Sequence, residues 1–195
     1  RILSHKLGLK LHIWIPEPVA ETIAANSTNA TVIHLGWLAT VISTVVDLRV
    51  ISQKELTNDF CGQSLHYKFV EVLLRESSEF RTLVPSLKQH ELFAAIQRFF
   101  QSVAYVDFDS NNVELNFSVG NFLHNMGKHF HDIVKNGLQL TKLAENIAHI
   151  IKSSALDLRS LMRSNIIILG GLSKIPGIKQ YILKVIETRL TESRC

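Results

Sequence analysis

The sequence has few of the features that mark disulfide-rich or membrane-spanning proteins. It contains two cysteines, Cys61 and Cys195, among 195 residues, too few for a disulfide scaffold, so we expect a reducing compartment. Its longest apolar runs, such as 166–169, are far shorter than the roughly 20 residues that cross a bilayer. Residues 1–14 alternate apolar and polar residues and lack the apolar core of a signal peptide. We therefore expect no contact with a membrane.

A strong excess of charge is also lacking. The chain has 21 Lys+Arg against 17 Asp+Glu, a formal net charge of +4, and its basic residues are scattered, so we expect no direct contact with nucleic acid. Hydrophobic residues make up 46%, enough apolar surface to exclude a disordered chain. Because the sequence opens on Arg1 without a methionine, we expect a fragment, a processed product or an incompletely traced protein.

The first third of the sequence is rich in strand patterns. Residues 8–15 alternate and predict a strand, and the prolines that follow it lead into a short helix over 19–25. Three β-branched runs, 30–35, 38–46 and 48–51, are broken at Gly36-Trp37 and at Asp47. This spacing predicts three consecutive antiparallel strands joined by tight turns.

The rest of the sequence is mainly helical. Apolar residues at helical spacing predict helices over 63–75 and 88–103, joined by a polar loop over 76–85. The further predicted elements are a strand at 113–119, helices at 119–135, 139–152 and 157–163, a buried strand at 165–169 and a final helix at 176–190. We expect an α/β fold.

The connection over 76–90 carries Phe80, Leu83, Val84 and Leu87 among polar residues. Apolar side chains in an exposed loop are costly unless a partner covers them. The pattern therefore favours a protein partner at this segment, or a loop that folds back and buries these side chains in its own domain. The sequence leaves both open.

The sharpest local signal is the buried strand that runs into Gly170-Gly171. Two glycines let a ligand approach the backbone, and the helix that follows offers free N–H groups. A nucleotide could bind there, but on Gly-Gly alone a plain strand-to-helix turn is the better interpretation.

Residues 165–177, with Gly-Gly followed by Pro-Gly, resemble the adenosine loop of actin and the actin-related proteins. Residues 29–42 resemble the second phosphate-loop hairpin of that family, and 61–69 resemble the start of the helix that follows it. The resemblance covers about residues 8–190. It implies an actin-like, ribonuclease H-like α/β fold, chiefly the half that carries the Gly-Gly loop. Together with the β-branched runs, the resemblance implies that the strand at 165–169 joins the sheet of the three early strands.

This resemblance divides the chain into four segments. They are 1–26, the end of the first subdomain sheet with the connecting helix; 27–60, the phosphate-loop meander; 61–110, a helical insert; and 111–195, further helices, the Gly-Gly strand and turn, and the final helix. Residues 113–117 running into 121–127 are similar to the divergent actin-related subunit at the pointed end of dynactin.

That likeness implies a non-catalytic structural subunit of a cytoplasmic, cytoskeletal complex. Its partners would be an actin-like filament subunit and other complex members. The alternatives are a nuclear actin-related protein of a chromatin-remodelling complex and a nucleotide-dependent ATPase of the same superfold.

Departures from the family pattern weaken the implied nucleotide site. His34 stands where actins have an acidic residue, and Leu38 replaces a phosphate-loop glycine. The Lys-Glu pair at the base and ribose falls at Gln97-Arg98, and Arg98 has no acceptor for a ribose hydroxyl. The first phosphate loop would precede this chain. The residues of this degenerate nucleotide site are His34, Gly36, Trp37, Gln97, Arg98, Gly170, Gly171 and Leu172.

We therefore expect no enzyme activity, no catalytic residue and no cofactor, with ATP or ADP bound weakly if at all. A cluster of His124, His129, His131 and Asp132 could recruit a metal. Positions 129 and 131 of a helix point to different faces, however, so we expect no metal site.

Overall fold

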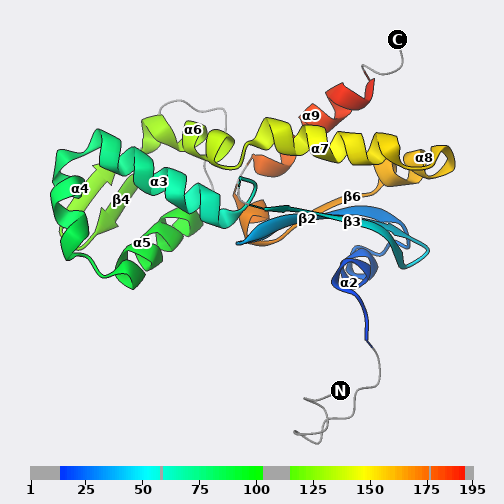
Figure 1. The fold of residues 1–195 in the computed structure, drawn as a ribbon, viewed down its shortest axis with the longest axis horizontal. Helices are drawn as coiled ribbons and strands as arrows, with labels where there is room; N and C mark the ends of the chain where they lie inside the picture. Colours follow the sequence, from blue (N-terminus) through cyan, green and yellow to red (C-terminus); the bar gives the residue numbers. More distant parts are fainter. Residues whose placement is uncertain (1–13, 58, 103–114, 176, 192–195) are drawn as a thin grey trace, which may run out of the picture.

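The computed structural model describes residues 14–57, 59–102, 115–175 and 177–191. These residues form two lobes that lie side by side along the long axis of the molecule (Figure 1). We call residues 14–57 and 140–191, which contain a four-stranded sheet, the sheet lobe. We call residues 59–102 and 115–137 the helical lobe.

The sheet confirms the predicted meander. Strands β1 (Ala30–Leu35), β2 (Ala39–Val46) and β3 (Arg49–Thr57) pair antiparallel in sequence order. Asp47 and Leu48 both adopt positive φ and make the two-residue turn between β2 and β3, whose twist matches that of its strands. Strand β3 continues past its predicted end at residue 51, because its ladder with β2 runs on to the pair Ala39–Thr57.

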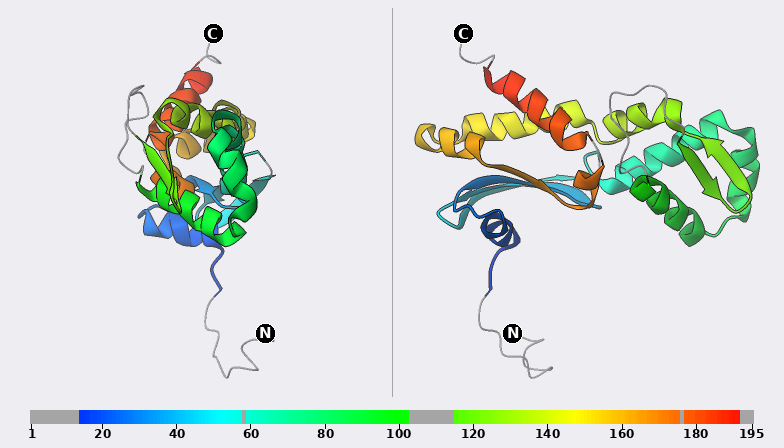
Figure 2. Two further views of the ribbon diagram at one scale, coloured as in Figure 1. Left: turned by 90° about the vertical axis from the view of Figure 1, so that its left-hand side faces the viewer. Right: turned by 180° about the vertical axis from the view of Figure 1, so that it is seen from behind.

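Strand β6 (Ile166–Leu169) joins the same sheet, as predicted, and pairs parallel to β1, so the strand order is β3-β2-β1-β6. Helix α2 (Glu17–Ala24) lies under one face of this sheet, where Val19, Val32 and Val45 form a small core. Helices α7 (Leu140–Ser153) and α9 (Ile178–Thr191) cover the other face, and α8 (Leu156–Ser164) connects α7 to β6 (Figures 1 and 2).

The helical lobe is built around phenylalanine. Helices α3 (Gly62–Glu76), α4 (Ser78–Leu83), α5 (Gln89–Ser102) and α6 (Gly127–Gly137) surround a hairpin of β4 (Asn116–Val119) and β5 (Phe122–Asn125). A short 3₁₀ turn, η1 (Val84–Ser86), links α4 to α5. Phe69, Phe80, Phe99, Phe117 and Phe122 form the centre, with neighbouring ring centroids 5.0–6.4 Å apart.

The prediction of a polar loop over 76–85 was wrong. The Ser77 hydroxyl accepts a hydrogen bond from the Phe80 N–H at 3.1 Å, which caps the N-terminus of α4. Phe80 is fully buried, and Leu83, Val84 and Leu87 pack partly buried against the same core. The segment folds back on its own lobe, so its apolar side chains do not mark a partner surface.

The helix predicted over 119–135 was also wrong at its start. Gly120 adopts φ +57°, and the chain turns there into β5 before α6 begins at Gly127. The predicted helices at 139–152 and 157–163 are confirmed. The predicted strand over 8–15 falls almost wholly outside the described residues. No helix in the described part of the chain is long and apolar enough to cross a membrane.

Candidate functional site

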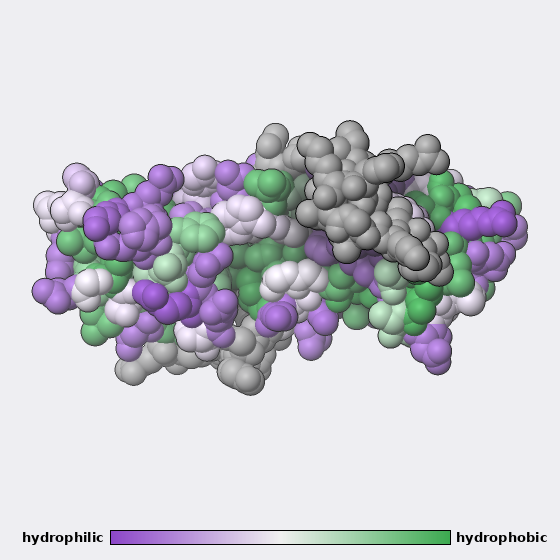
Figure 3. Space-filling view, turned by 90° about the horizontal axis from the view of Figure 1, so that it is seen from below, coloured by the Kyte–Doolittle hydropathy of each residue, from purple (hydrophilic) through white to green (hydrophobic). Residues whose placement is uncertain are grey.

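A pocket of about 500 Å³ lies where the two lobes meet. Five of the predicted site residues line this inter-lobe pocket: Gly36, Trp37, Gln97, Gly171 and Leu172. The others that line it are Leu35, Gly62, Leu65, His66, Phe93, Ile96, Phe100 and Gln101. Seen from below, from the side of α2, the middle of the molecule shows hydrophobic surface between the lobes (Figure 3). The fold thus brings together predicted residues from the β1–β2 loop, α5 and the Gly-Gly turn.

Trp37 is the largest side chain that the β1–β2 loop contributes to the pocket. Its ring lies edge-on to Phe93, with centroids 5.2 Å apart, and edge-on to His66 at 5.9 Å. The first residue of α3, Gly62, makes room for it, because a Cβ there would lie 2.7 Å from Cε3 of the Trp37 ring. Trp37 therefore packs the sheet lobe against the start of α3.

The backbone of the same loop is also bound to α3. The Gly62 N–H donates to the carbonyl of Gly36 at 3.0 Å, and the Gln63 N–H donates to the carbonyl of Trp37 at 2.9 Å. The Gly36 N–H donates to the Ala39 carbonyl at 3.1 Å and closes the turn. These N–H groups would otherwise attract an anion at a helix N-terminus or a glycine turn. Here the two N–H groups of α3 join the lobes, and the Gly36 N–H closes the turn within the sheet lobe.

The residues that line the pocket in the described part of the chain include no Lys, Arg, Asp or Glu. His66 is the one titratable side chain among them, and its Nε2 is buried without a hydrogen-bond partner among the described residues. Burial lowers the pKa of His66, since the charged imidazolium loses water there. The lining is mostly apolar and uncharged, with the amide side chains of Gln97 and Gln101 as further polar groups, so it favours an uncharged, largely apolar occupant.

Gly170 lies outside the pocket lining and has a packing role. It adopts φ +95°, and a Cβ there would lie 2.4 Å from the carbonyl oxygen of Leu35, so it lets the chain cross the end of β1 closely. Gly171, at the start of the 3₁₀ turn η2 (Gly171–Lys174), faces open space on the pocket side. Arg98 on α5 is exposed and does not line the pocket, whereas its neighbour Gln97 does.

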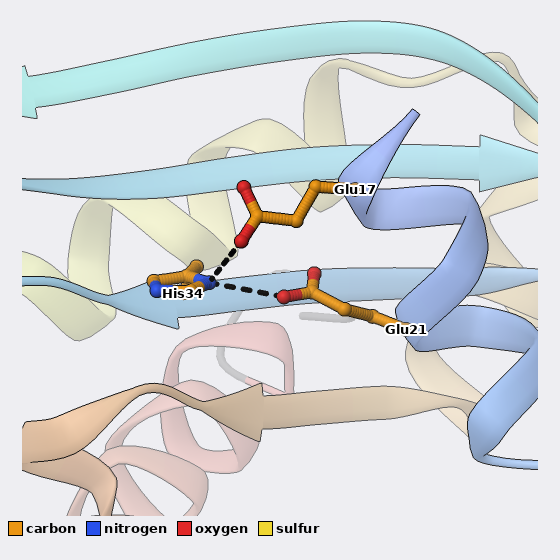
Figure 4. Close-up of side chains that lie close together, drawn as sticks. All are labelled: Glu17, Glu21 and His34. Carbon is orange, nitrogen blue, oxygen red and sulfur yellow. Dashed lines mark hydrogen bonds and ion pairs between the residues drawn. The ribbon is translucent and has the colours of Figure 1, made fainter. Parts of the chain in front are cut away.

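His34 lies away from the pocket, on the side of the sheet that α2 covers. Its Nδ1 is 3.0 Å from Oε1 of Glu21 and 3.5 Å from Oε1 of Glu17 (Figure 4). Side chains alternate along a strand, so position 34 shares its face with Val32 and not with the pocket residue Leu35. The structure thus separates His34 from the other predicted nucleotide residues and joins it to an acidic pair.

Sequence reasoning missed both carboxylates and His66. Glu17 and Glu21 are four apart on one helix, which places them on the same face, but only the fold shows that His34 meets that face. The Trp37–His66–Phe93 cluster combines three elements that are distant in sequence, so only the glycine at residue 62, at the start of α3, hinted at it.

Within the predicted histidine cluster, His124 and His129 contact other residues, and the side chain of His131 lies outside the described part of the structure. The ring of His124 stacks on Phe122 at 6.0 Å, and Nε2 of His129 lies 3.8 Å from Oε2 of Glu76. The hydrogen bond from Arg75, helped by His129, lowers the pKa of Glu76. This pair is a surface ion pair on the helical lobe.

Comparisons with known proteins identify the fold. No family model matches the sequence, and no curated protein matches it. Among solved structures, the ethanolamine utilization protein EutJ from Carboxydothermus hydrogenoformans matches with a TM-score of 0.52 at 13% identity. The match covers 88% of this chain and 47% of that protein, so the chain spans about half the length of EutJ. The fold is actin-like. At this identity the match establishes the fold alone, and the likeness to a dynactin subunit stays a prediction.

Proposed function

We propose that this chain is a non-catalytic, actin-like structural module in which the phosphate-loop position serves packing between lobes. The observation that carries the proposal is the closure of the β1–β2 loop on α3. Gly36 and Trp37 accept hydrogen bonds from the first N–H groups of α3, and the Trp37 ring stands against Gly62. In this arrangement the backbone of the loop and its largest side chain are used in contacts with α3.

The chemistry of the pocket supports the absence of ATP turnover. A triphosphate and its Mg²⁺ need cationic groups, free N–H donors and hard oxygen ligands. The described lining offers no charged side chain, and the Gly36 N–H already donates to Ala39. His34, at the position of the family's acidic residue, is held by Glu17 and Glu21 on the far side of the sheet. We propose that ATP and ADP bind weakly or not at all, and that the protein is not an enzyme.

We further propose that the module works inside a cytoplasmic, cytoskeletal assembly with an actin-like chain as its neighbour, at a filament end. The support is the sequence resemblance to the pointed-end subunit of dynactin together with the actin-like fold. The contacts of segment 76–90 do not add to it, because those side chains are internal. A nuclear complex with another actin-like chain is the alternative.

Two measurements test the proposal. Calorimetry with Mg·ATP should give no binding in the low micromolar range, and adenosine should bind no worse than ATP, because the described pocket residues contribute no charged group for phosphate. Low micromolar binding of Mg·ATP would contradict the non-catalytic assignment. Crosslinking mass spectrometry on the endogenous protein should recover an actin-like neighbour. Recovery as a monomer would refute the assembly, and crosslinks to remodeller subunits would favour the nuclear alternative.

A further inference from the structure

Glu17, Glu21 and His34 place three metal-ligating groups at one point between α2 and β1 (Figure 4). The nearest ligand atom of each side chain lies within 4.8 Å of the other two. Two carboxylate oxygens and one imidazole nitrogen form a donor set that first-row divalent metals accept. Among the described residues, these three are the group of His, Cys, Asp and Glu side chains that is close enough to share an ion.

The distances suit a metal in the middle. Ligands at about 2.0–2.2 Å from a tetrahedral Zn²⁺ lie about 3.3–3.6 Å from one another. Nδ1 of His34 lies 3.5 Å from the Glu17 oxygen, within that range, and 3.0 Å from the Glu21 oxygen, slightly below it. Small side-chain shifts would bring all three atoms to bonding distance.

The charges of Glu17 and Glu21 also favour a cation between these side chains. A neutral imidazole has at most one N–H at Nδ1, and both carboxylates face that nitrogen, so one proton serves two acceptors. No Lys or Arg among the described residues forms an ion pair with Glu17 or Glu21, and Glu21 keeps only 14% of its side-chain surface exposed. A divalent cation would neutralise both carboxylates at once.

The two elements that carry the donors are well anchored. Val19 and Thr22 of α2 are buried against the sheet, and the Thr22 hydroxyl donates to the Pro18 carbonyl at 2.7 Å within the helix. Strand β1 is an inner strand, paired with β2 on one side and β6 on the other. Glu17 is 72% exposed, so the site is open to solvent on one side, where water would complete the coordination.

We infer that Glu17, Glu21 and His34 form a binding site for a single Zn²⁺ or similar divalent transition-metal ion, which ties helix α2 to the end of strand β1. Such an ion would be structural and does not depend on the proposed function, since the site lies across the sheet from the inter-lobe pocket. It would fix the angle at which α2 enters the sheet lobe.

The test uses the untagged chain after treatment with a chelator. Titration calorimetry with Zn²⁺ alone should show one ion per chain, and Co²⁺ should give the visible absorption of a site with nitrogen and oxygen ligands. His34→Gln and Glu21→Gln should each weaken binding at least about tenfold, because losing a ligand costs no less than losing a group that orients one. Glu17→Gln should also weaken it, and this exposed position leaves the fold intact.

The matched control is the double variant Glu76→Gln with His129→Gln. It removes the other His–Glu pair of the described residues and should keep wild-type affinity and stoichiometry. Circular dichroism verifies that each variant is folded. The inference is overturned if the folded wild-type chain binds no Zn²⁺, if Glu17→Gln and His34→Gln bind it as tightly as wild type, or if the control loses the ion.

Discussion

Two histidines near the end of β1, His34 and His66, lie in opposite environments on the two sides of the sheet. On the α2 side, His34 faces two carboxylates and part of its ring reaches solvent. On the pocket side, His66 lies against the rings of Trp37 and Phe93, and its Nε2 has no partner among the described residues. The first side is a place for a cation, and the second is a place for an uncharged group.

The comparison shows why the side chain at position 34 does not contribute to the pocket. Along β1, residues 33 and 35 face the pocket side, so a residue at 34 cannot reach the pocket whatever its chemistry. Trp37 lies in the loop after β1, where this alternation does not apply, and its side chain lines the pocket. The direction of the loop therefore helps to determine which side chains line the pocket.

The largest expected effect comes from Gly170→Ala, which changes the packing of the backbone at the end of β1. The new Cβ would meet the Leu35 carbonyl at 2.4 Å, in a conformation that non-glycine residues rarely adopt. We expect a loss of at least about 3 kcal/mol in unfolding free energy, from backbone strain and the separation of β1 from β6. Urea unfolding followed by circular dichroism measures it.

Gly171→Ala is the control for that experiment. A Cβ at Gly171 meets nothing within 4 Å, and this residue has no positive φ. Its unfolding free energy should therefore stay within about 0.5 kcal/mol of wild type. An equal loss at both positions would mean that the crossing over Leu35 is not what requires glycine here.

Trp37→Ala should break the pocket side alone. The ring loses its contacts with Phe93, His66 and Gly62, and because Trp37 is 42% exposed we expect a loss of about 2 kcal/mol, less than for a fully buried tryptophan. Combined with Glu21→Gln, the two losses should add, since the residues lie on opposite sides of the sheet. Strong coupling between them would contradict the separation of the two sides.

The strands were predictable because their signals are local. The β-branched runs and the break at Asp47 predict the meander, and the apolar residues of 165–169 predict a buried strand. The resemblance to actins added the place of that strand in the sheet. The errors have tertiary causes. Phe80 makes 76–85 helical by entering a core assembled from distant segments, and Gly120 turns a predicted helix into a hairpin.

The candidate site was predictable only in part. The resemblance to actins led to Gly36, Trp37, Gln97, Gly171 and Leu172, which the fold brings into one pocket. The acidic pair opposite His34 required the packing of α2 under β1, which the spacing of residues along one helix cannot reveal.

Glu21→Gln should sharpen the contrast on the α2 side in metal-free protein. Glu21 is mostly buried and accepts a hydrogen bond from His34, so replacing the carboxylate should cost about 1 kcal/mol of unfolding free energy. Glu17→Gln should cost less than about 0.5 kcal/mol, because Glu17 is largely exposed. Urea unfolding in the presence of chelator distinguishes them, and the reverse order would show that the longer contact dominates.

The smallest expected effect is a pH dependence that belongs to His66. Burial holds the pKa of His66 below its ordinary value of 6.5. Just below pH 6.5 the unfolded chain therefore binds more protons at this residue than the folded chain does. Stability is therefore full above that value and falls as the pH drops below it. Between about pH 7.5 and about pH 5.5, wild type should lose more stability than His66→Phe, which keeps a ring but cannot titrate. The other histidines are common to both chains and cancel in the difference, while Glu76 titrates below this window. Urea midpoints at the two pH values measure the effect, and equal losses in both chains would show that His66 is not the buried, unpaired group on the pocket side.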